Sequence, residues 1–413
     1  MVVICMAGLL LSSCMKDKIT MTYRLYYPVY QSLTTFRAQI KAGDPVAIQQ
    51  PGKFCLWGNF IFLNEPLKGI HVIDNTDPVH PKNVSFINIP GNNELAIQGN
   101  ALFADVYGDL VSFDISNPAA AVAKNFVSNA FPERSNYYLP AGSTMNTDSI
   151  RVVASWKYKD TTVSYNTVSN FYPGGVMYSG CVNCAFNVAP GPASSSAGTG
   201  QNGSTAMFCI INNYLYTVGN SSLGTFDIAD PFKPLFTNTQ MVDWHVETIY
   251  PFRNNLFIGT NNGVYIYDVS SSPGTPGLAG EFTHVRGCDP VIADGNYAYV
   301  TLNDSSACLG FYNQLQIVDI RDFAHPFLEV SYSMTHPGGL SKSENLLFIA
   351  DGSGGLKIYN AADVNSLQLI KQFKGPVAGD IITRNGLAIL LARDGLYQYD
   401  YRDLNNIHQI SKL

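Results

Sequence analysis

The sequence has few charged residues and lacks the common catalytic motifs. Only 14% of its 413 residues are Asp, Glu, Lys or Arg, and the formal net charge is −6 at pH 7. A modestly acidic chain does not favour binding to nucleic acid or to an anionic membrane patch. The motifs G-x-S-x-G and H-E-x-x-H, the P-loop and a helix-opening G-x-G-x-x-G are all missing. We therefore assign no catalytic, cofactor-binding or metal-ligating residue from sequence, and we expect no cofactor.

The sequence also lacks an apolar run long enough to span a bilayer as a helix. Residues 2–11 are apolar, but this length is that of a signal-peptide core. The next residues, Leu11-Ser12-Ser13-Cys14, resemble a bacterial lipobox, although the basic residues expected before the core are missing. We expect a signal peptide at 1–13, a lipid (palmitate) anchor on Cys14 and a tether and closing segment at 14–47. The expected location is the bacterial cell envelope, at the outer membrane or cell surface.

A repeated phrase of short alternating strands is the strongest signal in the chain. It reads GIHVID at 69–74 and GVYIYD at 263–268. Its last residue recurs seven times, at Asp74, Asp114, Asp227, Asp268, Asp319, Asn360 and Asp400. Five of the six gaps are 40, 41, 51, 41 and 40 residues, and the gap after Asp114 is 113. A period of about 40–45 residues is typical of propeller blades, so the sequence predicts an all-β, seven-bladed β-propeller of four-stranded antiparallel blades.

The propeller is expected to be a single domain at residues 48–413. One four-stranded blade cannot bury both of its faces, so all blades must close into a ring to form a core. The segment around residues 35–41 is expected to close this ring by pairing with the last blade. The expected blades are 48–90, 91–128, 203–242, 243–286, 287–337, 338–374 and 375–413.

The seven recurring Asp and Asn side chains allow two interpretations. They could form a ring of carboxylates that binds a metal. Alternatively, each could cap a turn by accepting hydrogen bonds from backbone amides two or three residues further on. A residue that recurs once in every blade suits a scaffold better than a unique site, so we favour turn caps.

Residues 129–202 interrupt the period and are expected to be an inserted loop between blades 2 and 3. Residues 151–158 and 162–165 alternate like the strands of a hairpin, although a degenerate further blade would also fill this length. Long loops on a rigid scaffold often carry function. The aromatic side chains of the insertion, which include Phe131, Trp156 and Tyr158, could line a ligand surface or attach the insertion to the propeller.

Export would permit disulfides among the remaining cysteines. Cys288 opens the inner strand of the fifth blade and Cys308 lies in an enlarged turn of the same blade, so we predict that these two are bridged. The pair Cys181 and Cys184 could be a redox pair or half of a zinc site, but no second half follows, and a local disulfide or two free thiols is favoured. The other two, Cys55 and Cys209, lie in apolar strands and are expected to be buried.

A few polar residues are expected near the mouth of the propeller, where the inner strands begin. His245 is the histidine with the most polar surroundings, and Glu94, Asp289, Asp380 and Arg384 fall at comparable points of other blades. Such groups could converge on a ligand. They could equally line the water-filled channel that any propeller has.

The repeats also resemble a known family. The phrases V-I-D-x-x-D-P-x-x-P, G-V-Y-I-Y-D and L-Q-I-V-D-I, with Gly287-Cys288-Asp289-Pro290, are similar to the LVIVD-repeat family of propeller lipoproteins of Bacteroidetes-type bacteria. The resemblance covers residues 52–413 apart from the insertion. It implies a fold and a location, and it carries no catalytic residues. Asn360 in place of Asp departs from the pattern.

Two functions remain open from sequence. The first is a non-catalytic, monomeric envelope lipoprotein that binds a protein or polysaccharide partner through the propeller face and the insertion at 129–202. The alternative is an extracellular hydrolase or lyase with an active site at the axial mouth. Because no paired acid and base motif is present, the first is favoured.

Overall fold

The computed structural model describes residues 18–138, 151–166, 198–219, 221–284, 287, 290–304, 310 and 312–413. The chain forms two compact units, which we describe separately. Unit 1 comprises Met1–Arg37 and Tyr137–Pro190, and unit 2 comprises Ala38–Asn136 and Gly191–Leu413.

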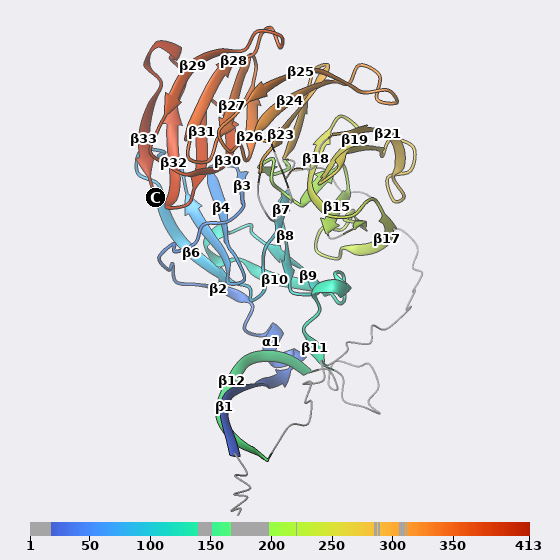
Figure 1. The fold of residues 1–413 in the computed structure, drawn as a ribbon, viewed down its shortest axis with the longest axis vertical. Helices are drawn as coiled ribbons and strands as arrows, with labels where there is room; N and C mark the ends of the chain where they lie inside the picture. Colours follow the sequence, from blue (N-terminus) through green and yellow to red (C-terminus); the bar gives the residue numbers. More distant parts are fainter. Residues whose placement is uncertain are drawn as a thin grey trace, which may run out of the picture. The chain divides into compact units, whose positions relative to one another are not determined.

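Unit 2 contains seven antiparallel sheets within the residues described, and Figure 1 shows them in chain order from blue to red. Sheet 1, in the order β13-β3-β4-β5-β6-β2, consists of β2 (Lys41–Gly43), β3 (Phe54–Trp57), β4 (Phe60–Glu65), β5 (Gly69–Asp74), β6 (Lys82–Asn88) and β13 (Gln201–Asn202). Sheet 2 consists of β7 (Leu95–Gln98), β8 (Ala101–Val106), β9 (Asp109–Asp114) and β10 (Val122–Val127). Sheet 3 consists of β14 (Phe208–Ile211), β15 (Tyr214–Gly219), β16 (Ser222–Asp227) and β17 (Leu235–Met241).

The other four sheets each have four strands in chain order. Sheet 4 consists of β18 (Val246–Phe252), β19 (Asn255–Thr260), β20 (Gly263–Asp268) and β21 (Gly277–Thr283). Sheet 5 consists of β22 (Val291–Asp294), β23 (Tyr297–Leu302), β24 (Gln314–Asp319) and β25 (Phe327–Ser333). Sheet 6 consists of β26 (Leu340–Ser343), β27 (Leu346–Ala350), β28 (Leu356–Asn360) and β29 (Gln368–Phe373). Sheet 7 consists of β30 (Ala378–Arg384), β31 (Leu387–Ala392), β32 (Gly395–Asp400) and β33 (His408–Lys412). The all-β class predicted from the sequence is confirmed.

The third strand of every sheet ends on the same turn cap. The side chain of Asp74 accepts a hydrogen bond from the amide of Thr76 at 2.9 Å, and the other six recurring residues accept one in the same way from the residue two positions further on. Each cap follows a register shift between the third and fourth strands, which is typical of a β-bulge. The prediction that these residues are turn caps is confirmed.

The first two strands of every sheet are joined by a two-residue turn whose first residue has a positive φ. These residues are Gly58, Gly99, Asn212, Arg253, Gly295, Glu344 and Asn385, with φ between 51° and 60°. Two-residue hairpin turns of this kind match the right-handed twist of the strands, and they favour Gly and Asn. Arg253 and Glu344 are therefore under backbone strain, because a side chain disfavours this conformation.

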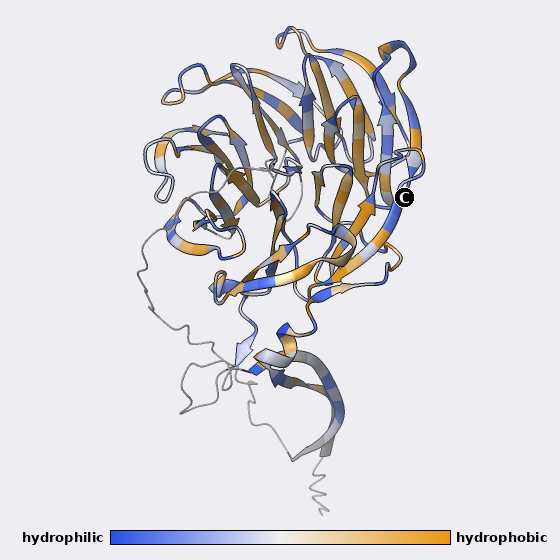
Figure 2. Cartoon of the chain, turned by 180° about the vertical axis from the view of Figure 1, so that it is seen from behind, coloured by the Kyte–Doolittle hydropathy of each residue, from blue (hydrophilic) through white to orange (hydrophobic). Residues whose placement is uncertain are grey.

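The core of unit 2 lies between consecutive sheets. Middle strands such as β8 and β19 are buried along their whole length, whereas outer strands such as β17 and β21 are largely exposed. Figure 2 shows the same contrast, with the inner strands mainly orange and the outer strands and loops a mixture of blue and orange. Phe54 of sheet 1 packs in one cluster with Ile382 and Ile389 of sheet 7, so the packing of the sheets is circular.

The circle is not closed in the way the sequence suggested. We expected residues 35–41 to pair with the last blade, but β2 (Lys41–Gly43) pairs with β6 of sheet 1. The fourth strand of sheet 7 is β33, which pairs with β32 and comes from the C-terminus itself. The predicted pairing of residues 35–41 with the last blade is therefore wrong, because sheet 7 already has an outer strand of its own. Side-chain packing between sheets 7 and 1 joins the two ends.

Unit 1 contains a long two-stranded ribbon. Its strands are β1 (Lys18–Ser32) and β12 (Arg151–Asn166), and β11 (Tyr137–Tyr138) extends one end. The short helix α1 (Leu33–Arg37) buries Leu33 and Phe36. The prediction of a hairpin within 151–165 is wrong, because this segment is one strand that pairs with residues 18–32, part of the segment expected to be a tether.

Three short 3-10 helices complete the described secondary structure. They are η1 (Pro118–Ala120), η2 (Pro132–Arg134) and η3 (Leu404–Asn406). Among the residues that the structure describes, no helix is long and apolar enough to cross a membrane.

Candidate functional site

Each sheet has one residue at the start of its innermost strand, five positions before the first residue of the hairpin turn that joins the first and second strands. In sheet 1, for example, Phe54 pairs with Leu63 and Trp57 pairs with Phe60, and the equivalent pairs recur in all seven sheets. The strand register therefore makes seven residues equivalent: Lys53, Glu94, Met207, Thr248, Pro290, Gly339 and Asp380. We call these the entry positions. The three charged members come from the consecutive sheets 7, 1 and 2, so charge is concentrated on one side of the circle.

Glu94 connects three sheets. Its carboxylate forms an ion pair with the ammonium group of Lys53, and it accepts a hydrogen bond from the amide of Met207 at 3.0 Å. The Glu94 side chain is 2% exposed, whereas that of Lys53 is 28% exposed. Burial raises the pKa of Glu94, and the nearby charge of Lys53 offsets part of this rise. Lys53 is thus the part of the pair that solvent and a ligand can reach.

The carboxylate of Asp380 packs closely against two other segments, residues 203–205 and Gly339. Its carboxylate accepts hydrogen bonds from the hydroxyl of Thr205 at 2.6 Å, the hydroxyl of Ser204 at 3.2 Å and the amide of Ile381 at 2.8 Å. A Cβ atom on Gly203 or Gly339 would lie 2.0 Å or 1.8 Å from its oxygens. Burial raises the pKa of Asp380, and the bond from Thr205 is the largest opposing effect.

Residues 198–206, which we call the central segment, run between the inner strands and join them. Within this segment, β13 pairs with β3, the amide of Gly200 donates to the carbonyl of Ile97 at 2.7 Å, and Ser204 accepts from the amide of Leu340 at 2.8 Å. A small cavity of about 220 Å³ remains beside it. The end of the predicted insertion is therefore part of the core of unit 2.

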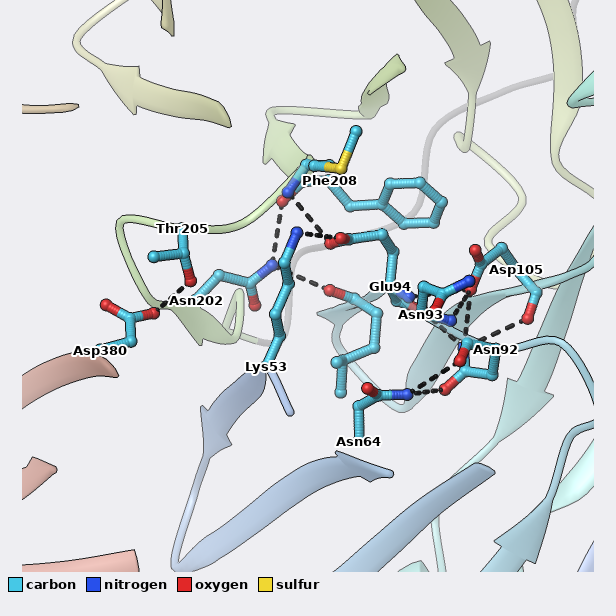
Figure 3. Close-up of polar contacts among 12 residues, drawn as sticks. Lys53, Asn64, Asn92, Asn93, Glu94, Asp105, Asn202, Thr205, Phe208 and Asp380 are labelled. Atoms are coloured by element: carbon cyan, nitrogen blue, oxygen red, sulfur yellow. Dashed lines mark hydrogen bonds and ion pairs between the residues drawn. The ribbon is translucent and has the colours of Figure 1, made fainter. Parts of the chain in front are cut away.

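The charged entry positions line an open pocket of about 750 Å³. Lys53, Glu94 and Asp380 contribute charged groups, and Glu133 and Arg134 of η2 contribute two more. Its apolar wall includes Pro66, Met207 and Leu391. In the view of Figure 3, Lys53 extends between the Glu94 side and the Thr205–Asp380 side of this site. We call this the entry pocket.

Arg134 is fixed at the pocket by Asp105. The two side chains form an ion pair at 2.5 Å, and the same Asp105 carboxylate accepts from the amides of Asn93 and Glu94, each at 2.8 Å. Burial raises the pKa of Asp105 and Arg134 opposes the rise. The Nη2 atom of Arg134 is buried and has no hydrogen-bond partner among the described residues. Because Nη2 is buried, a ligand in the pocket would contact the exposed part of the Arg134 side chain, which as a whole is 26% exposed.

Sheet 6 shows that the role of Asp105 is partly structural. Asp351 follows the second strand of that sheet, is fully buried, and accepts from the amides of Thr335 and His336, each at 2.9 Å. Lys357 forms an ion pair with it at 2.5 Å. Asp105 and Asp351 are thus alike, since each is a buried acid that accepts from two backbone amides and pairs with one basic side chain. The charges at the entry positions of sheets 7, 1 and 2 have no such counterpart in sheet 6.

The structure brings together two of the axial residues named from sequence. Glu94 and Asp380 both line the entry pocket, whereas His245 does not line it and is an exposed residue with φ of 57°. Arg384 lies at the far end of β30, next to the hairpin turn. Asp289 lies outside the described residues, as do Cys14, Cys181, Cys184, Cys288 and Cys308.

Sequence reasoning missed Lys53, Arg134 and Thr205. An alignment of the repeats by strand register would have found Lys53, because it occupies the position of Glu94 in the preceding sheet. Nothing in the repeat pattern indicates Arg134 or Thr205, since both belong to the interrupted region or its border. The predictions that Cys55 and Cys209 are buried are confirmed. Within the described ranges, no group of three or more His, Cys, Asp or Glu side chains is arranged to hold a metal ion.

Comparison with solved structures identifies the class of fold. A protein of Bacteroides fragilis NCTC 9343 proposed to be a 6-phosphogluconolactonase matches with a TM-score of 0.54 at 10% identity, over 90% of this chain and 97% of that one. A functionally unknown protein of Desulfotomaculum acetoxidans DSM 771 matches with a TM-score of 0.53 at 13% identity, over 86% and 96%. The computationally designed protein Ika8 matches with a TM-score of 0.51 at 9% identity, over 90% of each chain. These neighbours are β-propeller-like, and at such identities they show the fold alone.

Within this class, the chain carries LVIVD repeats. The model of the LVIVD repeat matches residues 92–127 and 288–334, which include sheet 2 and the described part of sheet 5. The resemblance to the LVIVD-repeat family predicted from the sequence is therefore confirmed. None of the curated proteins matches the sequence.

Proposed function

We propose that the protein is a seven-bladed propeller, lipid-anchored in the bacterial envelope through Cys14, which binds a protein or glycan partner at the entry pocket. Sheets 1–7 would be the seven blades. One observation carries the binding proposal. Lys53, Glu94 and Asp380 occupy equivalent positions in three sheets, but the residues at this position are not charged in the other four sheets. A scaffold repeats its residues, so charges confined to one side of the circle favour recognition of a specific ligand.

The composition of the pocket suits a ligand rich in hydroxyl and carbonyl groups. Lys53 and Arg134 can donate hydrogen bonds, and Glu133 can accept them. Met207 and Leu391 provide apolar contact between these groups. A few polar groups placed over an apolar wall are typical of sites that bind small ligands or ligand segments. A sugar residue or a peptide backbone presents both kinds of group.

The alternative, an extracellular hydrolase or lyase, has one observation in its favour. Glu94 and Asp380 are two carboxyl groups in one pocket, and burial raises the pKa of both. A raised pKa suits a general acid. However, the oxygens of both groups already accept hydrogen bonds from the scaffold. This pattern supports a role in holding the sheets together, and the binding function is the better supported of the two.

A neutral variant of the pocket tests the binding proposal. The double variant Lys53→Met, Glu94→Gln removes the ion pair without leaving a single buried charge, which protects the fold. We expect its capture of envelope glycans on an array, or of its partner in an envelope pull-down, to fall by roughly tenfold or more. Lys342→Met is the matched control, because it removes an ion pair with Asp294 away from the pocket. Equal binding by the double variant and the wild type would contradict the proposal.

The other parts of the proposal need separate measurements. Release of reducing ends from envelope polysaccharide by the wild type, lost in Glu94→Gln and in Asp380→Asn, would instead establish the enzyme. An experimental structure in which residues 139–150 and 167–197 form a further four-stranded sheet within the circle would contradict the count of seven blades.

A further inference from the structure

The ribbon of unit 1 is unusual because it has two long strands and little else. Its strands β1 and β12 pair over fifteen positions, from Lys18 with Asn166 to Ser32 with Arg151. A two-stranded ribbon is marginally stable in water unless one of its faces is covered. Most side chains described between positions 20 and 30, and between 155 and 162, are exposed. This surface therefore needs a partner.

On one face of the ribbon, side chains of β1 and β12 interact in pairs. Arg24 forms an ion pair with Asp160 at 2.8 Å and lies over the ring of Tyr158 at 4.1 Å. Tyr26, on the same face, packs against Tyr158 with ring centroids 6.0 Å apart. Cross-strand pairs of this kind stabilise a sheet. Arg24, Asp160, Tyr26 and Tyr158 of this face are thus engaged with one another, whereas Trp156 of the same face is 60% exposed.

The opposite face is apolar, aromatic and basic. Tyr23, Leu25 and Tyr27 alternate along β1 and are 40%, 47% and 47% exposed. Directly opposite Leu25 and Tyr27 lie Lys159 and Lys157, which form no ion pair with any described residue. Met21, at 58% exposed, continues the row on β1. We call these six residues the ribbon face.

The charge of the ribbon is opposite to that of the whole chain. Residues 20–32 and 155–162, together with Arg151, hold four basic residues and one acidic residue, whereas the chain has a net charge of −6. The total charge of the chain disfavours an anionic membrane, but attraction at the ribbon depends on this local excess of basic residues. Lys and Arg near a bilayer surface each contribute attraction to anionic lipids, and Tyr favours the interface between headgroups and acyl chains.

We propose that the ribbon face docks on the surface of an anionic lipid bilayer, next to the lipid anchor on Cys14. This inference rests on the proposed lipoprotein. Only Met15, Lys16 and Asp17 separate Cys14 from the first residue of β1, so an acylated Cys14 keeps the ribbon within reach of the headgroups. The acylated Cys14 and the ribbon face would then hold the protein at the same bilayer surface, since basic and apolar contacts add to the strength of a lipid anchor.

Vesicle binding by the unacylated full chain tests the ribbon face apart from the anchor. The Cys14→Ala variant is sedimented with phosphatidylcholine vesicles that contain or lack phosphatidylglycerol. We expect binding only to the anionic vesicles, and weaker binding as salt is raised. Added to this background, Lys157→Gln with Lys159→Gln should reduce binding by roughly tenfold or more. Tyr23→Ser with Tyr27→Ser should also reduce it. Lys371→Gln with Lys374→Gln, on exposed positions of unit 2, should leave it unchanged.

Each other outcome identifies what is wrong. If the Cys14→Ala variant binds neither kind of vesicle while the wild type carries a fatty acid and stays in the membrane fraction, the anchor stands and the ribbon face is wrong. If it binds anionic vesicles but the wild type carries no fatty acid, the anchor is wrong and the ribbon face stands. If it binds both kinds of vesicle equally, or forms a dimer that the ribbon-face substitutions dissociate, the assignment to an anionic bilayer is overturned.

Discussion

Lys53 and Glu94 occupy the same register position in sheets 1 and 2 and form an ion pair across the junction between these sheets. A repeat that only builds a scaffold would place similar residues at both positions. Here they have opposite charges, and Asp380 gives sheet 7 a third charged residue at that position. Pro290 and Gly339, at the same position of sheets 5 and 6, have no side-chain polar group. The difference between equivalent positions, rather than any motif, identifies the site.

The first prediction concerns the dependence of stability on pH. Burial raises the pKa of Asp380 in the folded protein above the ordinary value near 4. As pH falls from neutral, folded Asp380 therefore takes up a proton before the unfolded chain does, and the cost of its buried charge disappears. The stability of the wild type relative to Asp380→Asn should rise on acidification, by up to about 1.4 kcal/mol per pH unit between the raised value and pH ~4.

Urea unfolding at several pH values between neutral and about 4 measures this difference. Asp322→Asn is the control, because this exposed carboxylate bonds to His325 and to the amide of Ala324, which lowers its pKa, so the wild-type advantage at this position should not grow on acidification. A wild-type advantage that shrinks as pH falls would show that Asp380 is stabilised as a charged group.

The second prediction concerns the strained hairpin turns. Glu344 has a φ of 51°, a conformation that costs an ordinary residue about 1–2 kcal/mol. Asn occupies the equivalent position at Asn212 and Asn385. Glu344→Asn should therefore stabilise the protein by about 0.5–1 kcal/mol. The reciprocal substitution Asn385→Glu should destabilise it by a similar amount, and a lower urea midpoint for Glu344→Asn would contradict the argument.

The third prediction concerns the close packing around Asp380. A Cβ atom on Gly339 would lie 1.8 Å from the Asp380 carboxylate, so Gly339→Ala must displace this side chain. We expect a loss of about 1–3 kcal/mol in the free energy of unfolding. Gly379→Ala is the matched control, since its nearest neighbour atom would be 3.6 Å away. The double variant Gly339→Ala, Asp380→Ala no longer has the carboxylate that the new methyl group would displace. Its loss in the free energy of unfolding should therefore be smaller than the sum of the losses in the two single variants. Strict additivity would show that the glycine acts elsewhere.

The sequence predicts the repeating parts of this fold because they depend on local chemistry. The cap at Asp74 needs only an amide two residues away, and the repeated phrase at 69–74 is visible in the sequence itself. The partner of β1 could not be predicted, because it lies more than a hundred residues away and its apolar side chains remain exposed. Only some of the residues of the entry pocket could be predicted from the sequence. Glu94 and Asp380 stand at strand starts, whereas the position of Arg134 depends on a buried contact with Asp105 that no spacing indicates.

The fourth prediction tests the lipid anchor. Leu11-Ser12-Ser13-Cys14 ends a short apolar core, and Cys14 is the expected site of acylation. Cys14→Ala should reduce the share of protein in the membrane fraction and abolish labelling by fatty acid. Because the ribbon face is proposed to bind anionic lipid, part of the variant should stay bound until a high-salt wash. The matched control is Cys55→Ala, a buried cysteine within sheet 1, which should keep its label. Unchanged labelling of Cys14→Ala would contradict the anchor.

The last prediction is that Cys288 and Cys308 form a disulfide in the exported protein. Both lie outside the described residues, but the structure places the chain on either side of them. The amide of Thr301 donates to the carbonyl of Pro290 at 3.1 Å, so the segment that follows Cys288 runs beside the end of β23. A Cβ atom on Gly310 would lie 2.0 Å from the carbonyl oxygen of Asn303, so described residues on either side of Cys308 are close together just after the end of β23.

Mass mapping of a digest made without reduction checks this bridge. We expect one linked peptide pair containing Cys288 and Cys308, which separates on reduction. Closing the loop restricts the unfolded chain, so the bridge should contribute about 2–4 kcal/mol to stability, and the double variant Cys288→Ser, Cys308→Ser should unfold at lower urea in the absence of a reductant. With a reductant present, the wild type and the double variant should differ far less. Recovery of both cysteines as free thiols from the exported protein would show that the prediction is wrong.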